Sequence, residues 1–189
     1  MNILDWMNAP EGYVSRHTDM PAQRQTQAKA LCWEYNRTAP FEGEKRAKIL
    51  GQLLGTCHPL TFIEPDFHCD YGFNIHAHGL TVINYNCVIL DTSRVEIGAG
   101  TFIGPGCCLA CSGHSLDASQ RADGIGTSAP SRWAKMSGWA PMSPSAAVYP
   151  SAMEASSERA ASSPGIFPPV WLPLVIPAKS CVPSPKLTA

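Results

Sequence analysis

The chain has 189 residues and a formal net charge of −1. Its length allows one medium-sized domain with or without a tail, and its charge gives no electrostatic reason to expect binding to nucleic acid or to a membrane. The longest apolar run, around Val170 to Ile176, is interrupted by Pro173 and does not predict a bilayer span. No signal peptide is visible, so we expect a cytoplasmic protein with eight reduced cysteines.

Residues 1–58 are predicted to form an N-terminal helical cap. Pro21 stands at a position that the first turn of a helix tolerates. Apolar residues then recur at helical spacing, namely Ala28, Leu31, Cys32 and Tyr35. A second helix is expected from about Glu42 to Leu54, with Gly55 as its stop. Both helices are amphipathic, which favours a packing cap over a separate functional module.

Residues 59–127 change to short β segments with a six-residue rhythm. Ile97-Gly98, Ile103-Gly104 and Leu109-Ala110 recur at a spacing of six. An aliphatic residue followed by a small one at this period is typical of a left-handed parallel β-helix, an all-β solenoid in which three turns make one coil. The sequence therefore predicts β-helix coils through about residue 112, with the aliphatic side chains pointing inward.

Several polar and sulphur-containing residues are candidates for chemistry. His114, in a polar loop after the last clear turn, has the chemistry of a general base, although a lone histidine is more often an ordinary surface residue. Cys108 and Cys111 have a Cys-x-x-Cys spacing, but without a second pair of ligands they favour packed thiols on successive faces of a coil. His76 and His78 share one face of a strand and do not complete a metal site, so no metal is predicted.

Several segments, taken together, resemble one known family. These segments are Leu31–Asn36, Ile63–Pro65, Cys69–Ile75, Asn84–Asp91 and Gly113–Asp117. Their residues, order and spacing are similar to those of the maltose/galactoside O-acetyltransferases of the hexapeptide-repeat superfamily, over roughly residues 12–130. The resemblance implies a homotrimeric left-handed β-helix that moves an acetyl group from acetyl-CoA to a sugar hydroxyl, with the acceptor site between subunits.

The resemblance also implies roles for individual residues. His114 would be the catalytic base that takes the proton of the acceptor hydroxyl. Asn84, Asp70 and Asp91 would bind the acceptor or orient the histidine, whereas Asp117 lies in a matching segment without an assigned role. The chain departs from the family at Ser115, where a proline usually follows the histidine. No residue is matched to the binding of the coenzyme.

Residues 128–189 depart from the family altogether. They contain eleven of the seventeen prolines, no aspartate and only two glycines, and the six-residue period stops. Back-translation of Ser131 to Pro144, with one base restored in front, reads I-T-L-G-E-N-V-W-V-G-A-N-V-T, and the hexapeptide pattern continues in that frame. We interpret residues 128–189 as an irregular, frame-shifted tail; a natural Pro/Ser/Ala-rich tail is the alternative.

Two functions follow from this organisation. The first is a sugar O-acetyltransferase that is impaired as written because its coenzyme-binding coils are missing. The alternative is a non-catalytic, truncated β-helix that oligomerises or binds sugar weakly.

Overall fold

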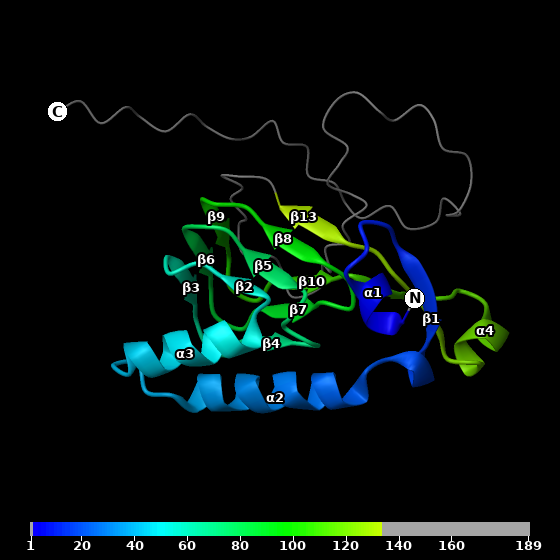
Figure 1. Ribbon diagram of the computed structural model, residues 1–189, viewed down its shortest axis with the longest axis horizontal. Helices are drawn as coiled ribbons and strands as arrows, with labels where there is room; N and C mark the ends of the chain where they lie inside the picture. Colours follow the sequence, from blue (N-terminus) through cyan, green and yellow to red (C-terminus); the bar gives the residue numbers. More distant parts are fainter. Residues whose placement is uncertain (1, 134–189) are drawn as a thin grey trace, which may run out of the picture. The chain divides into compact units, whose positions relative to one another are not determined.

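The computed structural model describes residues 2–133, which form a stack of short parallel strands with two long helices along one side (Figure 1). The helices are α1 (Ile3–Met7), η1 (His17–Asp19), α2 (Ala22–Arg37), α3 (Gly43–Leu53) and α4 (Ala118–Ala122). The strands before residue 85 are β1 (Tyr13–Arg16), β2 (Thr56–Cys57), β3 (Thr61–Ile63), β4 (His68–Cys69), β5 (Ile75–Ala77) and β6 (Thr81–Ile83). The later strands are β7 (Val88–Leu90), β8 (Val95–Ile97), β9 (Thr101–Ile103), β10 (Cys108–Ala110), β11 (Ser112–His114), β12 (Ile125–Ser128) and β13 (Ser131–Trp133).

Three parallel sheets form the sides of the coils. Their strand orders are β3-β6-β9, β10-β7-β4 and β13-β8-β5-β2, so each sheet takes one strand from every coil. Thr61 pairs with Thr81 and Thr81 with Thr101, which sets a repeat of 20 residues per coil. This differs from a strict period of six, because successive strands begin at Thr81, Val88, Val95 and Thr101 and two of the three sides are seven residues long.

The aliphatic residues that the six-residue pattern places inward are buried. Ile97, Ile103 and Leu109 are each at most 4 % exposed. Residues one coil apart stack on one another, as in the column of Ile63, Ile83 and Ile103. The extra residue on two sides therefore sits in the corners and leaves the inward columns intact. At one such corner Asn86 and Gly106, which are one coil apart, have φ angles of 60° and 72°.

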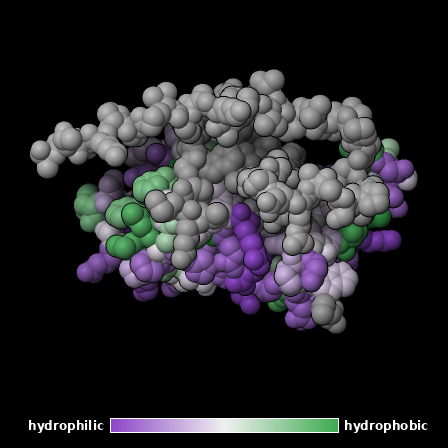
Figure 2. Space-filling model, turned by 90° about the horizontal axis from the view of Figure 1, so that it is seen from above, coloured by the Kyte–Doolittle hydropathy of each residue, from purple (hydrophilic) through white to green (hydrophobic). Residues whose placement is uncertain are grey.

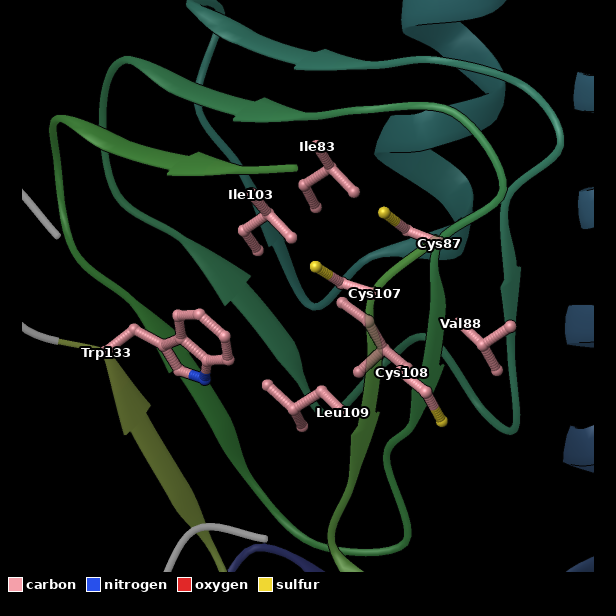
Figure 3. Close-up of a pocket in the computed structure, with 9 residues that line it drawn as sticks. Ile83, Cys87, Val88, Ile103, Cys107, Cys108, Leu109 and Trp133 are labelled. Atoms are coloured by element: carbon pink, nitrogen blue, oxygen red, sulfur yellow. The ribbon is translucent and has the colours of Figure 1, made fainter. Parts of the chain in front are cut away.

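The coil interior is apolar and nearly filled (Figure 3). The sulphur atoms of Cys87 and Cys107 point toward Ile83 and Ile103, and Trp133 lies across from Leu109. The space that these side chains leave has a volume of about 10 Å³, which is close to that of a single water. Cys108 begins β10 and Cys111 follows it, so the two lie along one side of a coil and not on successive faces as the sequence predicted.

The helices lie close to the predicted positions, and they pack on the first coil. Tyr35 of α2 donates its hydroxyl proton to the carbonyl of Ile63, and Arg46 of α3 donates to the same two groups. Asn36 makes two further bonds to the backbone of Phe67, as donor and as acceptor, each of 2.9 Å. These bonds fix α2 beside the corner that leads into β4.

The structure changes two boundaries that the sequence predicts. Residues 13–16 form β1, which pairs with β12 within the segment expected to be only helical. Residues 131–133 form β13, which pairs with β8 in the register of the coils, although the tail was expected to be irregular from residue 128. Ser131 and Trp133 are buried where inward positions fall, so this part of the prediction was wrong. The expectation for 134–189 lies outside the described residues.

The outer face of β3-β6-β9 carries an apolar patch. Phe62 and Phe102 project from it, and Leu60, Leu80 and Tyr85 flank it; all five are at least 43 % exposed. Figure 2 shows green, apolar residues gathered on the left, the side on which Figure 1 places β3, β6 and β9. In the described part of the chain, no helix is long and apolar enough to cross a membrane.

The bonds between Asn36 and Phe67 make a testable contribution to stability. We expect Asn36→Ala to lower the free energy of unfolding by about 1–3 kcal/mol, because the amide and carbonyl of the buried Phe67 lose their partner. Urea denaturation measures this change. The exposed Gln27→Ala on the same helix is the control, and an equal loss in both variants would contradict the role of these bonds.

Candidate active site

His114 lies on an excursion that leaves the coil after β10 and returns at β13. Its strand β11 pairs antiparallel with β12, and β1 completes this small sheet. The His114 side chain is exposed, and its backbone lies opposite Gly126. At Gly113, a Cβ atom would stand 2.8 Å from the Thr127 hydroxyl oxygen, so the backbone before the histidine is closely packed. The excursion thus presents the imidazole to solvent on an ordered strand.

The turn after His114 is held by its own side chains. Asp117 caps the short helix α4 by accepting from the N–H groups of Ser119 and Gln120. The hydroxyl hydrogen bond from Ser119, followed by these backbone bonds, lowers the pKa of Asp117. Ser115 donates to the Gln120 side chain over 2.7 Å. Asp117 therefore has a structural role in shaping the loop that carries His114.

Asp70 and Asp91 meet at the corner from which this excursion departs. The Oδ1 atom of Asp91 accepts from the N–H groups of Asp70 and Tyr71, at 3.0 and 2.8 Å. Asp70 is half-buried and accepts from Gln25 of α2 at 3.2 Å. Burial raises the pKa of Asp70, and the Gln25 hydrogen bond opposes this effect. Gln25 is a neighbour of Asp70 that no sequence motif indicated.

Asp91 itself is completely buried in the chain. Its side chain is 0 % exposed, and its Oδ2 atom has no hydrogen-bond partner within residues 2–133. Burial raises the pKa of Asp91 to about 7, although the N–H of Tyr71 opposes the shift. A sugar on the surface of one chain does not reach this carboxyl. Its geometry argues for positioning the Asp70 backbone and not for binding an acceptor.

Asn84 lies at a different corner, between β6 and β7. Its N–H donates to the carbonyl of Ile103 one coil further on, and its Oδ1 accepts from the N–H of Tyr85. The half-buried side chain keeps its Nδ2 group to donate elsewhere. Strand β7 separates this corner from the one where Asp70 and Asp91 meet. One chain therefore brings Asp70, Asp91 and the base of the His114 loop together, but places Asn84 apart from them.

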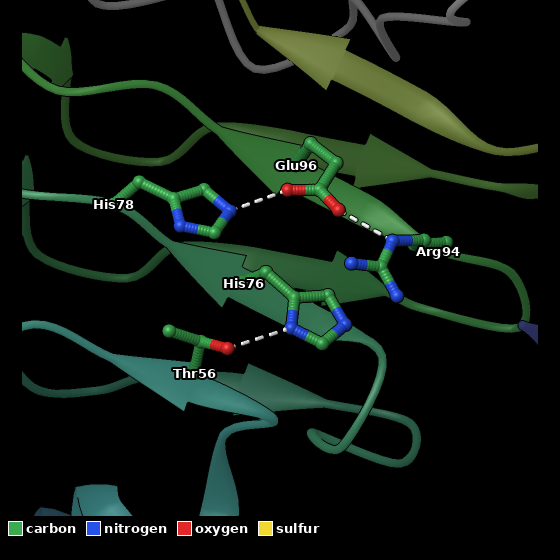
Figure 4. Close-up of polar contacts among 5 residues, drawn as sticks. All are labelled: Thr56, His76, His78, Arg94 and Glu96. Carbon is green, nitrogen blue, oxygen red and sulfur yellow. Dashed lines mark hydrogen bonds and ion pairs between the residues drawn. The ribbon is translucent and has the colours of Figure 1, made fainter.

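A second polar cluster lies on the outer face of β2, β5 and β8 (Figure 4). His76 and His78 project from one face, as expected, with ring centroids 6.4 Å apart. Thr56 bonds to Nδ1 of His76, whereas Glu96 bridges His78 and Arg94. Burial raises the pKa of Glu96, but its bonds to His78 and Arg94 outweigh this and lower it. Within residues 2–133, no group of three or more His, Cys, Asp or Glu side chains is placed to hold a metal ion.

The buried Asp91 predicts a pH dependence of stability. Its folded pKa, about 7, lies above the ordinary 3.8, so folding favours the protonated form. This contribution is complete below about pH 4 and is lost as pH rises through 7, and it amounts to about 2–3 kcal/mol between pH 5 and 8. We expect denaturant titrations to show this loss in the unmodified chain and a flatter profile in Asp91→Asn. The exposed Asp123→Asn should keep the full dependence; a parallel loss in both variants would assign the effect elsewhere.

Comparisons with known proteins identify the family. The maltose acetyltransferase hexapeptide capping motif matches residues 7–58. Galactoside O-acetyltransferase of Escherichia coli is 31 % identical over 130 residues, which cover 69 % of this chain and 64 % of that protein. The chain spans about half to two thirds of the length of the curated relatives it matches.

Two solved structures share the fold. The hexapeptide-repeat acetyltransferase of Vibrio cholerae, solved with acetyl coenzyme A, is 28 % identical, with a TM-score of 0.61 and 69 % of each chain covered. A maltose O-acetyltransferase from Clostridium difficile is 31 % identical, with a TM-score of 0.62 and 69 % of each chain covered. With the capping motif and the stacked parallel coils, these likenesses show that the chain belongs to the maltose/galactoside O-acetyltransferase family.

Proposed function

We propose that residues 2–133 are the acceptor half of an acetyl-CoA-dependent sugar O-acetyltransferase with a left-handed β-helix fold. The observation that carries this proposal is the exposed His114 on an ordered strand, in a chain of this family. Acetyl coenzyme A is the donor substrate, as in the Vibrio cholerae relative. A sugar hydroxyl is the acceptor, in line with the galactoside and maltose enzymes that the chain resembles.

The chemistry assigns one role to each residue at the site. The imidazole of His114 takes the proton of the sugar hydroxyl as its oxygen attacks the thioester carbonyl. The C–S bond then breaks, and the coenzyme thiolate takes up the proton from the imidazolium. Asn84 donates a hydrogen bond from Nδ2 to the acceptor, and Asp70 accepts one from a sugar hydroxyl. Asp91 holds the Asp70 backbone in place and does not touch the sugar.

A homotrimer accounts for the separation of Asn84 from His114. Because the two residues lie at different corners of one coil stack, a single chain does not bring them to one acceptor. A cyclic assembly sets one corner of each copy against another corner of its neighbour. The apolar patch around Phe62 and Phe102 supplies exposed surface that such contacts would bury. The acceptor site is then shared between two subunits.

The chain as written is proposed to be impaired in its donor half. Strands β9 and β10 each pair on only one side within the described residues, so the coil stack ends in open edges there. Acetyl transfer needs the thioester to be held within reach of the hydroxyl, because positioning supplies much of the rate. Further coils beyond residue 133 would supply this grip. The alternative, a non-catalytic truncated β-helix, is favoured by the same open edges.

The register of β13 supports the frame-shift interpretation. Ser131 and Trp133 occupy buried inward positions, paired with Val95 and Ile97 of β8. The restored frame, I-T-L-G, puts isoleucine and leucine at these same two positions and glycine after them. This matches Val95-Glu96-Ile97-Gly98 on the coil below. Pairing of backbones and the alternative reading frame are separate observations, and they agree on which residues point inward.

The test compares the chain as written with a version in which residues 131–189 follow the restored frame. We expect the restored protein to acetylate galactosides or maltose with acetyl-CoA, measured by thiol release and by the mass of the sugar product. The chain as written should show little or no turnover. Robust acetylation by the written chain, with its intact mass verified, would contradict the proposed impairment. Equal inactivity of a folded restored protein over a panel of sugars would favour the non-catalytic alternative.

In the restored protein, His114→Ala should lower kcat/KM by about 10²- to 10⁴-fold, the usual contribution of a general base. His58→Ala removes an exposed histidine remote from this loop and is the control. Sedimentation of both variants reports whether assembly is retained. Activity that survives His114→Ala would show that another group is the base.

A further inference from the structure

Two cysteines outside the proposed acceptor site form a close pair. Cys32 on α2 and Cys69 on β4 have sulphur atoms 3.6 Å apart, although 37 positions separate them in sequence. Both are free thiols, 2 % and 6 % exposed. A disulfide requires a separation of about 2.05 Å, so small side-chain rotations suffice to bring the two atoms into bonding distance. None of the proposed acetyl-transfer steps uses this pair.

The pair also has an approach from solvent. Both cysteines line a surface pocket of about 590 Å³ between α2 and the corner that precedes β4. Lys29, Arg37 and His68 line it as well, against one carboxylate, Asp66. A predominantly cationic wall favours the thiolate form, which is the reactive form of cysteine. The surroundings therefore combine access for a small oxidant with charges that favour the reaction.

We propose that Cys32 and Cys69 are an oxidisable dithiol that hydrogen peroxide converts to a disulfide tethering α2 to β4. The Cys32 thiolate attacks one peroxide oxygen, the O–O bond breaks, and the released hydroxide takes a proton to become water. The product is a sulfenic acid on Cys32. The Cys69 sulphur then attacks the Cys32 sulphur, and the hydroxyl leaves as a second water with the Cys69 proton. Two thiols are oxidised and one peroxide is reduced.

The electrostatics of the pair give the two thiols different roles. The hydrogen bond with Cys69 lowers the pKa of Cys32. The same bond, together with burial and the nearby Asp91, raises the pKa of Cys69. Cys32 is thus the thiol that meets the oxidant, and Cys69 is the resolving thiol. The other described cysteines do not share a sulphur–sulphur contact of this kind.

The experiment treats the purified full chain with stoichiometric hydrogen peroxide and counts thiols after denaturation. We expect the count to fall from the eight cysteines of the chain to six and to return to eight with dithiothreitol. Peptide mapping without reductant should show one cross-link, between the peptides that contain Cys32 and Cys69. The oxidised chain should melt at a higher temperature than the reduced chain, since the bond closes a long loop.

Variants separate the two steps. In Cys69→Ser, dimedone should label Cys32, because its sulfenic acid persists without a resolving thiol. In Cys32→Ser, Cys69 should stay unlabelled and no cross-link should form. Cys108→Ser changes a half-buried cysteine outside the pocket and should retain the cross-link. A cross-link between other cysteines, or a thiol count that stays at eight in the unmodified chain, would overturn the proposal. The peptide map of that chain decides even if a variant does not fold.

Discussion

The register of 20 residues between successive coils is the constraint on which the rest of the structure depends. Every inward side chain stacks on its equivalent one coil away, so the apolar columns form only if the backbone pairs in that register. A shift by one residue would turn each buried residue outward. The corners absorb the difference between sides of six and seven residues, with left-handed backbone at Asn86 and Gly106. Corner geometry thus protects the columns, and the columns in turn position the excursion that carries His114.

The sequence predicted the parts of the fold that depend on local periodicity. Ile97, Ile103 and Leu109 are inward because an aliphatic residue followed by a small one is a pattern that one short segment displays by itself. The coil length was missed, since the extra residues sit at corners where Tyr85 and Pro105 do not interrupt the apolar pattern. Strand β1 was also missed, because its only partner, β12, lies more than 100 positions away in the chain.

The candidate site was predicted only in part, for reasons of distance and solvation. His114 and Asp70 carry recognisable motifs, and both reach the surface at the corner that precedes the excursion. Asp91 reads as a polar surface residue in sequence, whereas the N–H groups of Asp70 and Tyr71 allow its carboxyl to be buried. The separation of Asn84 from His114 is a property of the coil geometry, and no spacing along one chain reveals which copy completes a site.

The excursion between β10 and β13 has a consequence for how such a protein diversifies. Ser131 pairs with Val95, 36 positions earlier, where other coils advance by 20, so the excursion adds 16 residues without disturbing the sheet that it rejoins. Its departure and return points are both fixed by the coil, whereas its interior is fixed by its own hairpin and by the Asp117 cap. Loops of other lengths can be exchanged at this junction at little cost in closure entropy. Acceptor preference can therefore evolve within the excursion while the stability of the scaffold is inherited unchanged.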